Sequence, residues 1–223
     1  DRDVHSVPTP RMGGLAMLAG FAVALLVASR TTFLGEVFTI SSQAWAILGA
    51  AGLICLLGAA DDIWDLGWMT KLVGQVLAAG LMVWQGVQLV TVPLFDSIAI
   101  LSPNMLLAVT LLVVLVAINA VNFVDGLDGL AAGLITIGGT AFFIYSYLLT
   151  RSTESDYSDL ATLVIAGVVG ACLGFLPHNF FKASIFMGDS GAMFLGLTVS
   201  AAAIIVTGNI DPGTSQQQSD LAV

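Results

Sequence analysis

Charged side chains are scarce in this sequence: they make up 9% of its 223 residues, whereas a soluble domain carries about 25%. Hydrophobic residues make up 57% of the chain, and its mean hydropathy is +0.98. A soluble core could not bury so much apolar surface. The composition therefore excludes an ordinary soluble enzyme and predicts a protein embedded in a membrane.

Basic residues are scarcer still, with six Lys and Arg against fifteen Asp and Glu and a formal net charge of -9. This balance excludes nucleic-acid binding through a polybasic surface. Two cysteines, Cys55 and Cys172, lie inside apolar runs, which is typical of small packing residues. The chain begins with the polar segment DRDVHSVPTPR, without the apolar stretch of a signal peptide, so we expect a piece of a longer protein.

Long apolar runs, by contrast, are abundant. Because about 20 mostly apolar residues span a bilayer as a helix, these runs predict about seven transmembrane helices. The predicted spans are Met12–Ser29, Ala44–Ala60, Leu72–Gln88, Met105–Val121, Gly129–Leu149, Leu160–Leu176 and Ala192–Thr207. All four tryptophans fall near span ends, as is typical of rings that prefer the headgroup region. The predicted fold is an all-α integral membrane protein, a polytopic helical bundle in which residues 1–223 form a single membrane domain.

Successive spans alternate in direction, so every second connection lies on the same side of the membrane. The side of the amino terminus, here called face one, then receives the loops Asp61–Lys71, Asn122–Asp128 and His178–Asp189. Four of the six basic residues also fall on face one, namely Arg2, Arg11, Lys71 and Lys182. By the positive-inside rule, this bias predicts that face one is cytoplasmic.

Three carboxylates on face one favour a site for a divalent cation. Asp61 and Asp62 end the second span in GAADDIWD, and Asp189 precedes the seventh span in IFMGDSGAMFLG. Adjacent like charges at the end of an apolar helix are unfavourable unless something neutralises them. We therefore predict that all three bind Mg²⁺, which prefers carboxylate and phosphate oxygens, with Mn²⁺ as an alternative. A solvated helix end for the Asp pair and an ordinary helix start for Asp189 stay open.

The stretch AINAVNFVDGLDGLAAG places four polar residues, Asn119, Asn122, Asp125 and Asp128, at intervals of three. On a helix this spacing keeps polar groups near one face. Two Asp-Gly turns at a helix end would explain the carboxylates but not the asparagines within apolar sequence, which favour a functional site.

Two further segments complete face one. HSVPTPRMGG contributes His5 and Arg11, and PHNFFKASIF contributes His178, Asn179, Lys182 and Phe186. For Lys71 and Lys182 a role as plain membrane anchors stays open, and His178 fits an ordinary interfacial residue better than a ligand.

With these motifs assembled, the chain resembles the polyprenyl-phosphate N-acetylhexosamine-1-phosphate transferases, multi-span enzymes that begin lipid-linked glycan assembly. PTPRMGG, the Asp pair that ends a span, NAVNFVDGLDGLAAG and IFMGDSG occur in the family's order and cover nearly the whole chain. Arg11, His5 and NFVDGLDG in place of NLTDGLDG are similar to the branch that uses UDP-N-acetylglucosamine (UDP-GlcNAc).

The resemblance implies transfer of GlcNAc 1-phosphate from UDP-GlcNAc to a polyprenyl phosphate, with release of UMP and a requirement for Mg²⁺. It implies a first membrane step of bacterial cell-envelope glycan synthesis, such as that of teichoic acid, lipopolysaccharide or arabinogalactan. The expected location is the inner (plasma) membrane with a cytoplasmic active site, and a homodimer is an expected assembly.

The resemblance also implies roles for individual residues. Uridine would be bound by Asn122, Asp125, Asp128 and Asn179, with Phe186 as a stacking ring. Substrate binding would further involve Arg11, Lys71 and Lys182 at the diphosphate, and His5. Asp189 would hold the metal with one of Asp61 and Asp62, while the other would orient or deprotonate the lipid phosphate. Which of the two does which stays open.

Two departures from the family's pattern are evident. The family has ten or eleven spans, with one ahead of PTPR and several after GDSG, and the later ones are joined by a His-rich loop that this sequence does not contain. In addition, Arg2-Asp3-Val4 replaces the more usual Arg-Lys-Val before the histidine.

Three other functions compete with this interpretation. The muramoyl-pentapeptide branch of the same superfamily typically has PTMGG where this chain has PTPRMGG. A cation-coupled transporter would need ionisable groups near the middle of the bilayer and a route to both faces. A catalytically inactive fragment is the third alternative.

Overall fold

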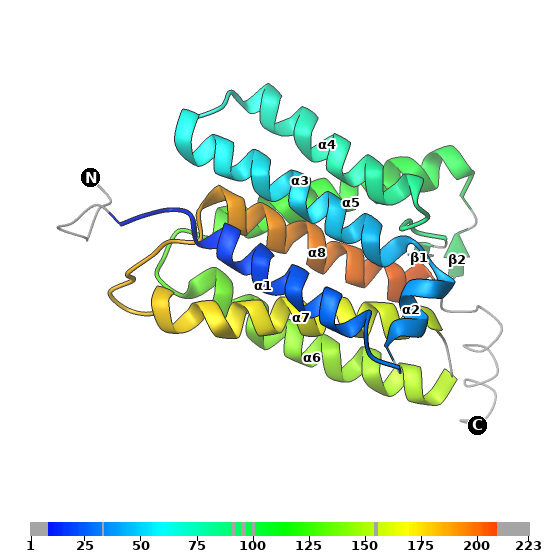
Figure 1. The fold of residues 1–223 in the computed structure, drawn as a ribbon. Coiled ribbons are helices and arrows are strands. Elements are labelled where there is room, and N and C mark those ends of the chain that lie inside the picture. Colours follow the sequence, from blue (N-terminus) through cyan, green and yellow to red (C-terminus); the bar gives the residue numbers. More distant parts are fainter. Residues whose placement is uncertain are drawn as a thin grey trace.

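The computed structural model describes residues 9–32, 34–90, 92–94, 97–99, 101–153 and 156–208 (Figure 1). Long helices dominate it. They are α1 (Gly13–Ala28), α3 (Gln43–Trp64), α4 (Trp68–Trp84), α5 (Pro103–Val124), α6 (Leu130–Thr153), α7 (Asp156–Asn179) and α8 (Gly188–Gly208), with one short helix, α2 (Gly35–Ile40). Two three-residue strands, β1 (Val92–Leu94) and β2 (Ser97–Ala99), pair antiparallel between α4 and α5.

The predicted helical membrane bundle is confirmed. Five described helices, α3, α5, α6, α7 and α8, are long and apolar enough to cross a membrane, and α1 and α4 are shorter apolar helices. Each predicted span corresponds to one of these seven helices. The bundle therefore has the order of spans that the hydropathy pattern indicates.

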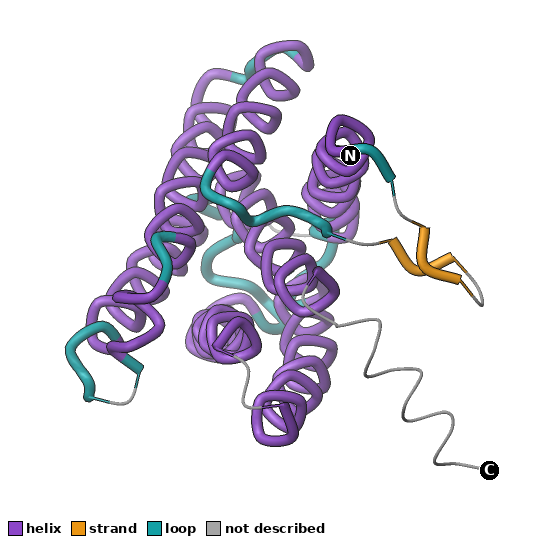
Figure 2. The backbone as a smooth tube through the Cα atoms, turned by 90° about the vertical axis from the view of Figure 1, so that its right-hand side faces the viewer, coloured by secondary structure: helices purple, strands orange, loops and turns teal. Residues whose placement is uncertain are grey.

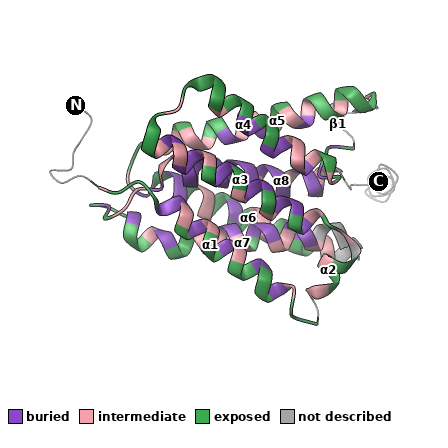
Figure 3. Ribbon diagram, turned by 45° about the horizontal axis from the view of Figure 1, so that its top comes forward, coloured by how far each residue is buried: buried purple, intermediate pink, exposed green. Residues whose placement is uncertain are grey.

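Helix α8 lies at the centre of the bundle, and 83% of the most apolar 18-residue stretch of this helix is buried. It packs against α1, α3, α5 and α7, and Figure 3 shows α8 largely in the colour of buried residues. By contrast, only 17% of the corresponding stretch is buried in α5 and in α6, so most of their apolar surface is available to contact lipid. The amino terminus of α8 therefore lies among the other helix ends, at the centre of one end of the bundle.

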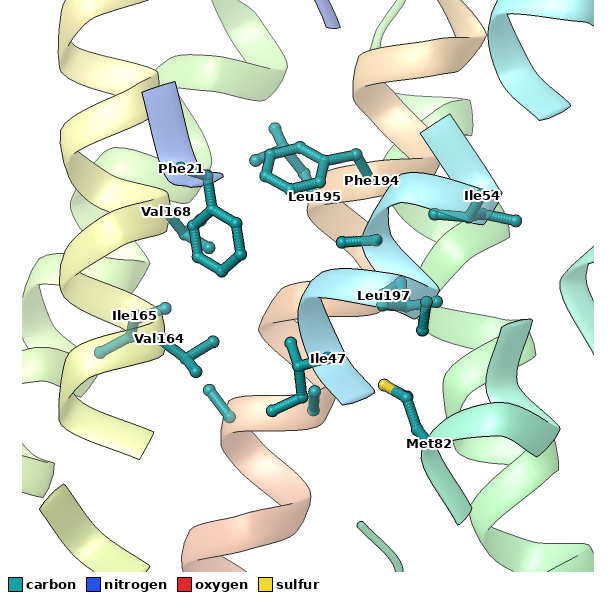
Figure 4. Packing of buried hydrophobic residues seen from close by; sticks show 14 of the residues in the cluster. Phe21, Ile47, Ile54, Met82, Val164, Ile165, Val168, Phe194, Leu195 and Leu197 are labelled. Carbon is teal, nitrogen blue, oxygen red and sulfur yellow. The ribbon is translucent and has the colours of Figure 1, made fainter. Parts of the chain in front are cut away.

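The core around α8 is apolar. The rings of Phe21 on α1 and Phe194 on α8 meet edge to face with centroids 5.5 Å apart, and Ile54 and Leu197 pack nearby (Figure 4). In a membrane such packing stabilises helix association through van der Waals contact, because lipid is as apolar as the side chains.

The two ends of the bundle differ. At one end lie the start of α1, the α3–α4, α5–α6 and α7–α8 connections, and the amino terminus of α8 (Figure 1); we call it the charged end. The opposite end carries α2, the strands, the end of α6 and the start of α7, and we call it the hairpin end. Figure 2 views the molecule from the hairpin end, with the strands beside the helices. The connections that parity assigned to face one therefore do lie together.

Several predicted boundaries were wrong. Helix α3 continues to Trp64, so Asp61 and Asp62 lie in its last turns and not in a loop. The third span, predicted as Leu72–Gln88, forms as Trp68–Trp84, because the chain turns at Gln85 and the Val87 N–H donates back to the Met82 carbonyl. Hydropathy stops a span at its first charge, whereas a helix continues where that charge finds a partner.

Candidate active site at the charged end

Asp62 connects α3 to the amino terminus of α8. Its two carboxylate oxygens accept hydrogen bonds from the backbone N–H groups of Asp189, at 3.1 Å, and Ser190, at 3.2 Å. The first N–H groups of a helix have no partner within it and carry a partial positive charge, so a carboxylate stabilises them. Asp62 thus caps α8, a role that its sequence position alone did not indicate.

This cap depends on a close approach of two backbones. Gly58 lies one turn before Asp62, and a Cβ at this position would lie 2.5 Å from the Cα and N of Ser190. On the other side of α8, a Cβ on Gly14 of α1 would lie 2.1 Å from the Gly191 nitrogen. Glycine at both positions lets α1 and α3 flank the start of α8 without a side chain between them.

Asp61 and Asp189 converge on one ammonium group. Lys71, in the first turn of α4, forms ion pairs with Asp61 and, at 3.3 Å, with Asp189. The other oxygen of Asp61 accepts a hydrogen bond from the Leu66 N–H at 2.7 Å. The side chain of Asp61 is 6% exposed, so this charge needs a partner. Residues from α3, α4 and α8 thereby place two carboxylates and one cation at a single point.

The chemistry of this point suits a hard divalent cation with few protein ligands. Among the described residues no group of three or more His, Cys, Asp and Glu side chains is arranged to hold a metal ion. Mg²⁺, however, is usually bound through one or two carboxylates together with substrate phosphates. The pair of Asp61 and Asp189, which already meets at one positive charge, supplies that number.

Asp125 ends α5 beside this cluster. Burial raises the pKa of its carboxyl group to about 6, and the negative charges of Asp189 and Asp62 act in the same direction. Asn122, one turn earlier on α5, is half-buried. The structure therefore brings the polar stretch at the end of α5 to the same site as the three carboxylates.

Asn179 and Asp128 hold two connections together. Buried Asn179 accepts a hydrogen bond from the Gly129 N–H at 3.0 Å and donates one to the Ile185 carbonyl at 3.0 Å. Asp128 accepts a hydrogen bond from the Ala183 N–H at 3.1 Å. Both side chains thus bind backbone groups of the α5–α6 and α7–α8 connections, and their predicted role in uridine binding stays a prediction.

Three backbone hydrogen bonds join the start of α1 and the residues before it to the α7–α8 connection. The Phe186 N–H donates to the Pro10 carbonyl at 2.8 Å, and the N–H groups of Gly13 and Gly14 donate to the carbonyls of Phe186 and Met187 at 3.0 Å each. These hydrogen bonds hold the half-buried Phe186 next to Gly188 and Asp189.

The remaining predicted residues lie around this site or outside the described residues. Arg11 and Lys182 are exposed at the charged end, as is His178. Lys182 has a left-handed backbone, with φ of +54°, in the turn after α7. His5 lies outside the described residues, so its place stays a prediction.

A contact that the sequence did not indicate lies one turn from Lys71. Gln75 of α4 is 2% exposed, and its side-chain oxygen accepts a hydrogen bond from the Asn119 amide of α5 at 2.9 Å. Gln75 was not among the predicted site residues. Its spacing of four from Lys71 on one helix was the available signal.

The chain is similar to known proteins over most of its length. The sequence model of glycosyl transferase family 4 matches residues 44–207. The decaprenyl-phosphate N-acetylglucosaminephosphotransferases of Mycolicibacterium smegmatis and Mycobacterium leprae are 45% and 44% identical over 214 residues, which are 94% of this chain and 53% and 54% of those proteins. A phospho-N-acetylmuramoyl-pentapeptide-transferase of Desulforudis audaxviator is 34% identical over 226 residues, covering 92% of this chain and 64% of that protein. The chain thus spans about half the length of the two mycobacterial relatives.

Proposed function

Because the chain belongs to glycosyl transferase family 4, we propose that it acts in the transfer of GlcNAc 1-phosphate from UDP-GlcNAc to a polyprenyl phosphate, with release of UMP. The main observation behind this proposal is that Asp61 and Asp189 meet at the Lys71 ammonium group, at one end of a membrane bundle. The proposal includes a cytoplasmic charged end in a bacterial plasma membrane, where a nucleotide sugar is available and the lipid acceptor reaches the site from the bilayer.

The proposed reaction exchanges one phosphoanhydride bond for another. An oxygen of the polyprenyl phosphate attacks the phosphorus that bears the sugar, a new P–O bond forms, and the bond to the bridging oxygen breaks so that UMP leaves with the electron pair. The second pKa of a phosphate monoester is about 6, so the acceptor is largely dianionic at pH 7 and needs no strong base. Positioning and charge neutralisation are then the protein's main tasks.

The charged end offers groups for both tasks. We propose that Asp189 and Asp61 hold Mg²⁺, which would neutralise charge on the phosphate oxygens when bound. Asp62 fixes the start of α8 and thereby the place of Asp189. Lys71, Arg11 and Lys182 are proposed to bind the diphosphate.

The uridine end of the donor is assigned to the other side of the cluster. Asn122 and Asp125 at the end of α5 are proposed as hydrogen-bonding groups and Phe186 as the stacking ring, since Asp125 senses the charges of Asp62 and Asp189. Asp128 and Asn179 would then act partly by holding the two connections that frame the uridine.

The transporter alternative lacks support in the described part of the chain. There, every Asp and Glu lies in a helix's first or last turns or in a connection, and the interiors of the apolar helices carry none. A cation path through the bilayer would require ionisable groups at mid-depth.

The test is release of UMP from UDP-GlcNAc by the purified protein in lipid nanodiscs, with polyprenyl phosphate and Mg²⁺ each present or omitted. We expect UMP only when both are present. A parallel reaction with UDP-MurNAc-pentapeptide tests the second candidate function, transfer of the muramoyl-pentapeptide phosphate. The similarity to the Desulforudis protein is the reason to test it. Faster turnover of the pentapeptide donor would exclude the GlcNAc assignment, and no release from either donor would refute the proposed function.

A further inference from the structure

A neutral hydrogen bond joins α4 to α5 just below the charged cluster. The Asn119 side-chain amide donates to the Gln75 side-chain oxygen at 2.9 Å and also to the carbonyl of Leu115 on its own helix at 2.7 Å. Gln75 is 2% exposed, whereas Asn119 lies on the exposed surface of α5, and both residues lie within apolar helices. Burying an amide such as that of Gln75 is unfavourable unless it is hydrogen-bonded, and an apolar side chain would pack there at no such cost.

Stability is a weak reason for this pair. Hydrogen bonds between membrane helices contribute little on average, because the separated helices also find partners for their polar groups. A directional bond between two side chains does, however, fix the rotation and the axial position of one helix against the other. The pair is therefore better explained by the geometry that it imposes than by the stability that it adds.

The position of the Gln75–Asn119 pair indicates which part of the site depends on it. Gln75 lies four residues after Lys71, and therefore on the same face of α4, one turn away. Asn119 lies three residues before Asn122 and six before Asp125. Lys71 is the group of α4 that reaches across to Asp61 of α3 and Asp189 of α8. A rotation of α4 would thus move the Lys71 ammonium away from both carboxylates.

We infer that Gln75 and Asn119 are positioning residues for the transfer reaction: their hydrogen bond sets the rotation of α4 against α5 and so keeps Lys71 beside Asp61 and Asp189, next to the end of α5. Neither residue is assigned a contact with substrate. This inference rests on the proposed function, because it concerns the geometry of the same site.

The variants follow from this geometry. Gln75→Leu and Asn119→Leu remove the bond and put an apolar side chain of similar size in its place. The exchanged double variant Gln75→Asn/Asn119→Gln shortens one side chain and lengthens the other by one methylene, so the bridge keeps its total length. The matched control is Gln85→Leu, which removes a glutamine contact just after α4, the hydrogen bond that Ser42, just before α3, donates to Gln85 at 3.0 Å at the hairpin end.

We expect Gln75→Leu and Asn119→Leu to lower kcat for UMP release about tenfold or more, since a displacement of about 1 Å can lower a rate on the order of 100-fold. The KM for UDP-GlcNAc should change less, by no more than about threefold, because Arg11, Lys182 and the groups proposed to bind uridine keep their places. Gln85→Leu should keep kcat within about twofold. The exchanged variant should recover most of the kcat that either single variant loses.

The measurements are steady-state UMP release and the fraction of folded protein, determined by size-exclusion chromatography and thermal unfolding. Equal kcat values for Gln75→Leu and Gln85→Leu would overturn the inference, and so would a loss of kcat that merely follows the loss of folded protein. If the single variants fold poorly, the exchanged variant decides: folded protein without recovered kcat contradicts the inference. Absence of UMP release from the unaltered protein would instead refute the proposed function.

Discussion

The charged end and the hairpin end both carry polar contacts between residues far apart in the sequence, but the chemistry of these contacts differs. At the charged end, carboxylates meet a lysine and the N–H groups of a helix terminus, as in the contacts of Asp61 with Lys71 and of Asp62 with Asp189. At the hairpin end the partners are neutral: Ser42 donates to Gln85 at 3.0 Å, and Gln43 donates to the Gly86 carbonyl at 3.1 Å.

The basic residues show the same difference. Arg30 and Arg151 at the hairpin end are exposed, as expected of solvated connectors. Lys71, in contrast, is pulled into ion pairs with partly buried carboxylates. Neutral hydrogen bonds suffice to hold turns together. Partly buried charges are unfavourable, and they are typical of sites that bind charged ligands. The comparison therefore supports the proposed phosphate chemistry at the charged end and structural roles at the hairpin end.

The largest expected effect is that of Asp189→Asn. The substitution keeps the size of the side chain and removes the charge that meets Lys71, so UMP release should fall at least 10–100-fold, about the effect expected of losing a metal ligand. The control is Asp65→Asn at the same end of the bundle, where an exposed residue with φ of +48° tolerates Asn as well as Asp. Retention of more than about a tenth of the activity by the Asp189 variant would contradict a metal-binding role.

The next effect is that of Gly58→Ala. A methyl group there would lie 2.5 Å from the backbone of Ser190 and would push the start of α8 away from Asp62. Overpacking of this kind typically costs about 1–3 kcal/mol. We expect a lower unfolding temperature and several-fold less UMP release.

The matched control for Gly58→Ala is Gly52→Ala on the same helix, where an added Cβ has no atom within 4 Å. This variant should be as stable as the original protein or slightly more so, because Ala favours the helix. Equal unfolding temperatures for the two variants would show that the approach of α3 to α8 is not tight.

The arrangement of the spans could be predicted from the sequence because it depends on local properties. Apolar runs of sufficient length form helices in a membrane, and parity then places their connections on one face or the other. For the same reason the sequence alone assigns Asp61, Asp125 and Asp189 to one end of the bundle. The strands at Val92–Leu94 and Ser97–Ala99 could not be predicted, because each has three residues and one contains a proline.

The division of labour among the carboxylates could not be predicted, since it depends on contacts between distant residues. The sequence shows Asp61 and Asp62 as neighbours, yet a helix turns them by about 100° relative to each other. Asp62 therefore meets the start of α8 while Asp61 meets Lys71. Only the packing of α3 against α8, more than a hundred residues later in the chain, separates the two roles.

A smaller effect concerns the pH dependence of stability through Asp125. Its pKa is raised from 3.8 to about 6 in the folded protein, so the folded state binds the proton more tightly than the unfolded state. Ionisation then destabilises the fold as pH rises through that window. Asp125→Asn should therefore raise the unfolding temperature by a few degrees at pH 7.5, and the gain should disappear near pH 4. A gain of equal size at both pH values would show that the charge is not its cause, with Asp65→Asn as the control at an exposed carboxylate.

The smallest effect is expected at the hairpin end, for Ser42→Ala. This change removes a solvent-exposed hydrogen bond to Gln85, so water replaces the hydroxyl and the loss of stability should be no more than about 1 kcal/mol. The kcat and KM of UMP release should remain within about twofold of those of the unaltered protein, because no charge of the opposite end moves. Thermal unfolding and steady-state kinetics on the same preparation measure both quantities. A Ser42→Ala variant that unfolds at nearly the original temperature yet loses about tenfold in kcat would break the comparison between the two ends, since it would give the neutral contacts of the hairpin end a part in the chemistry.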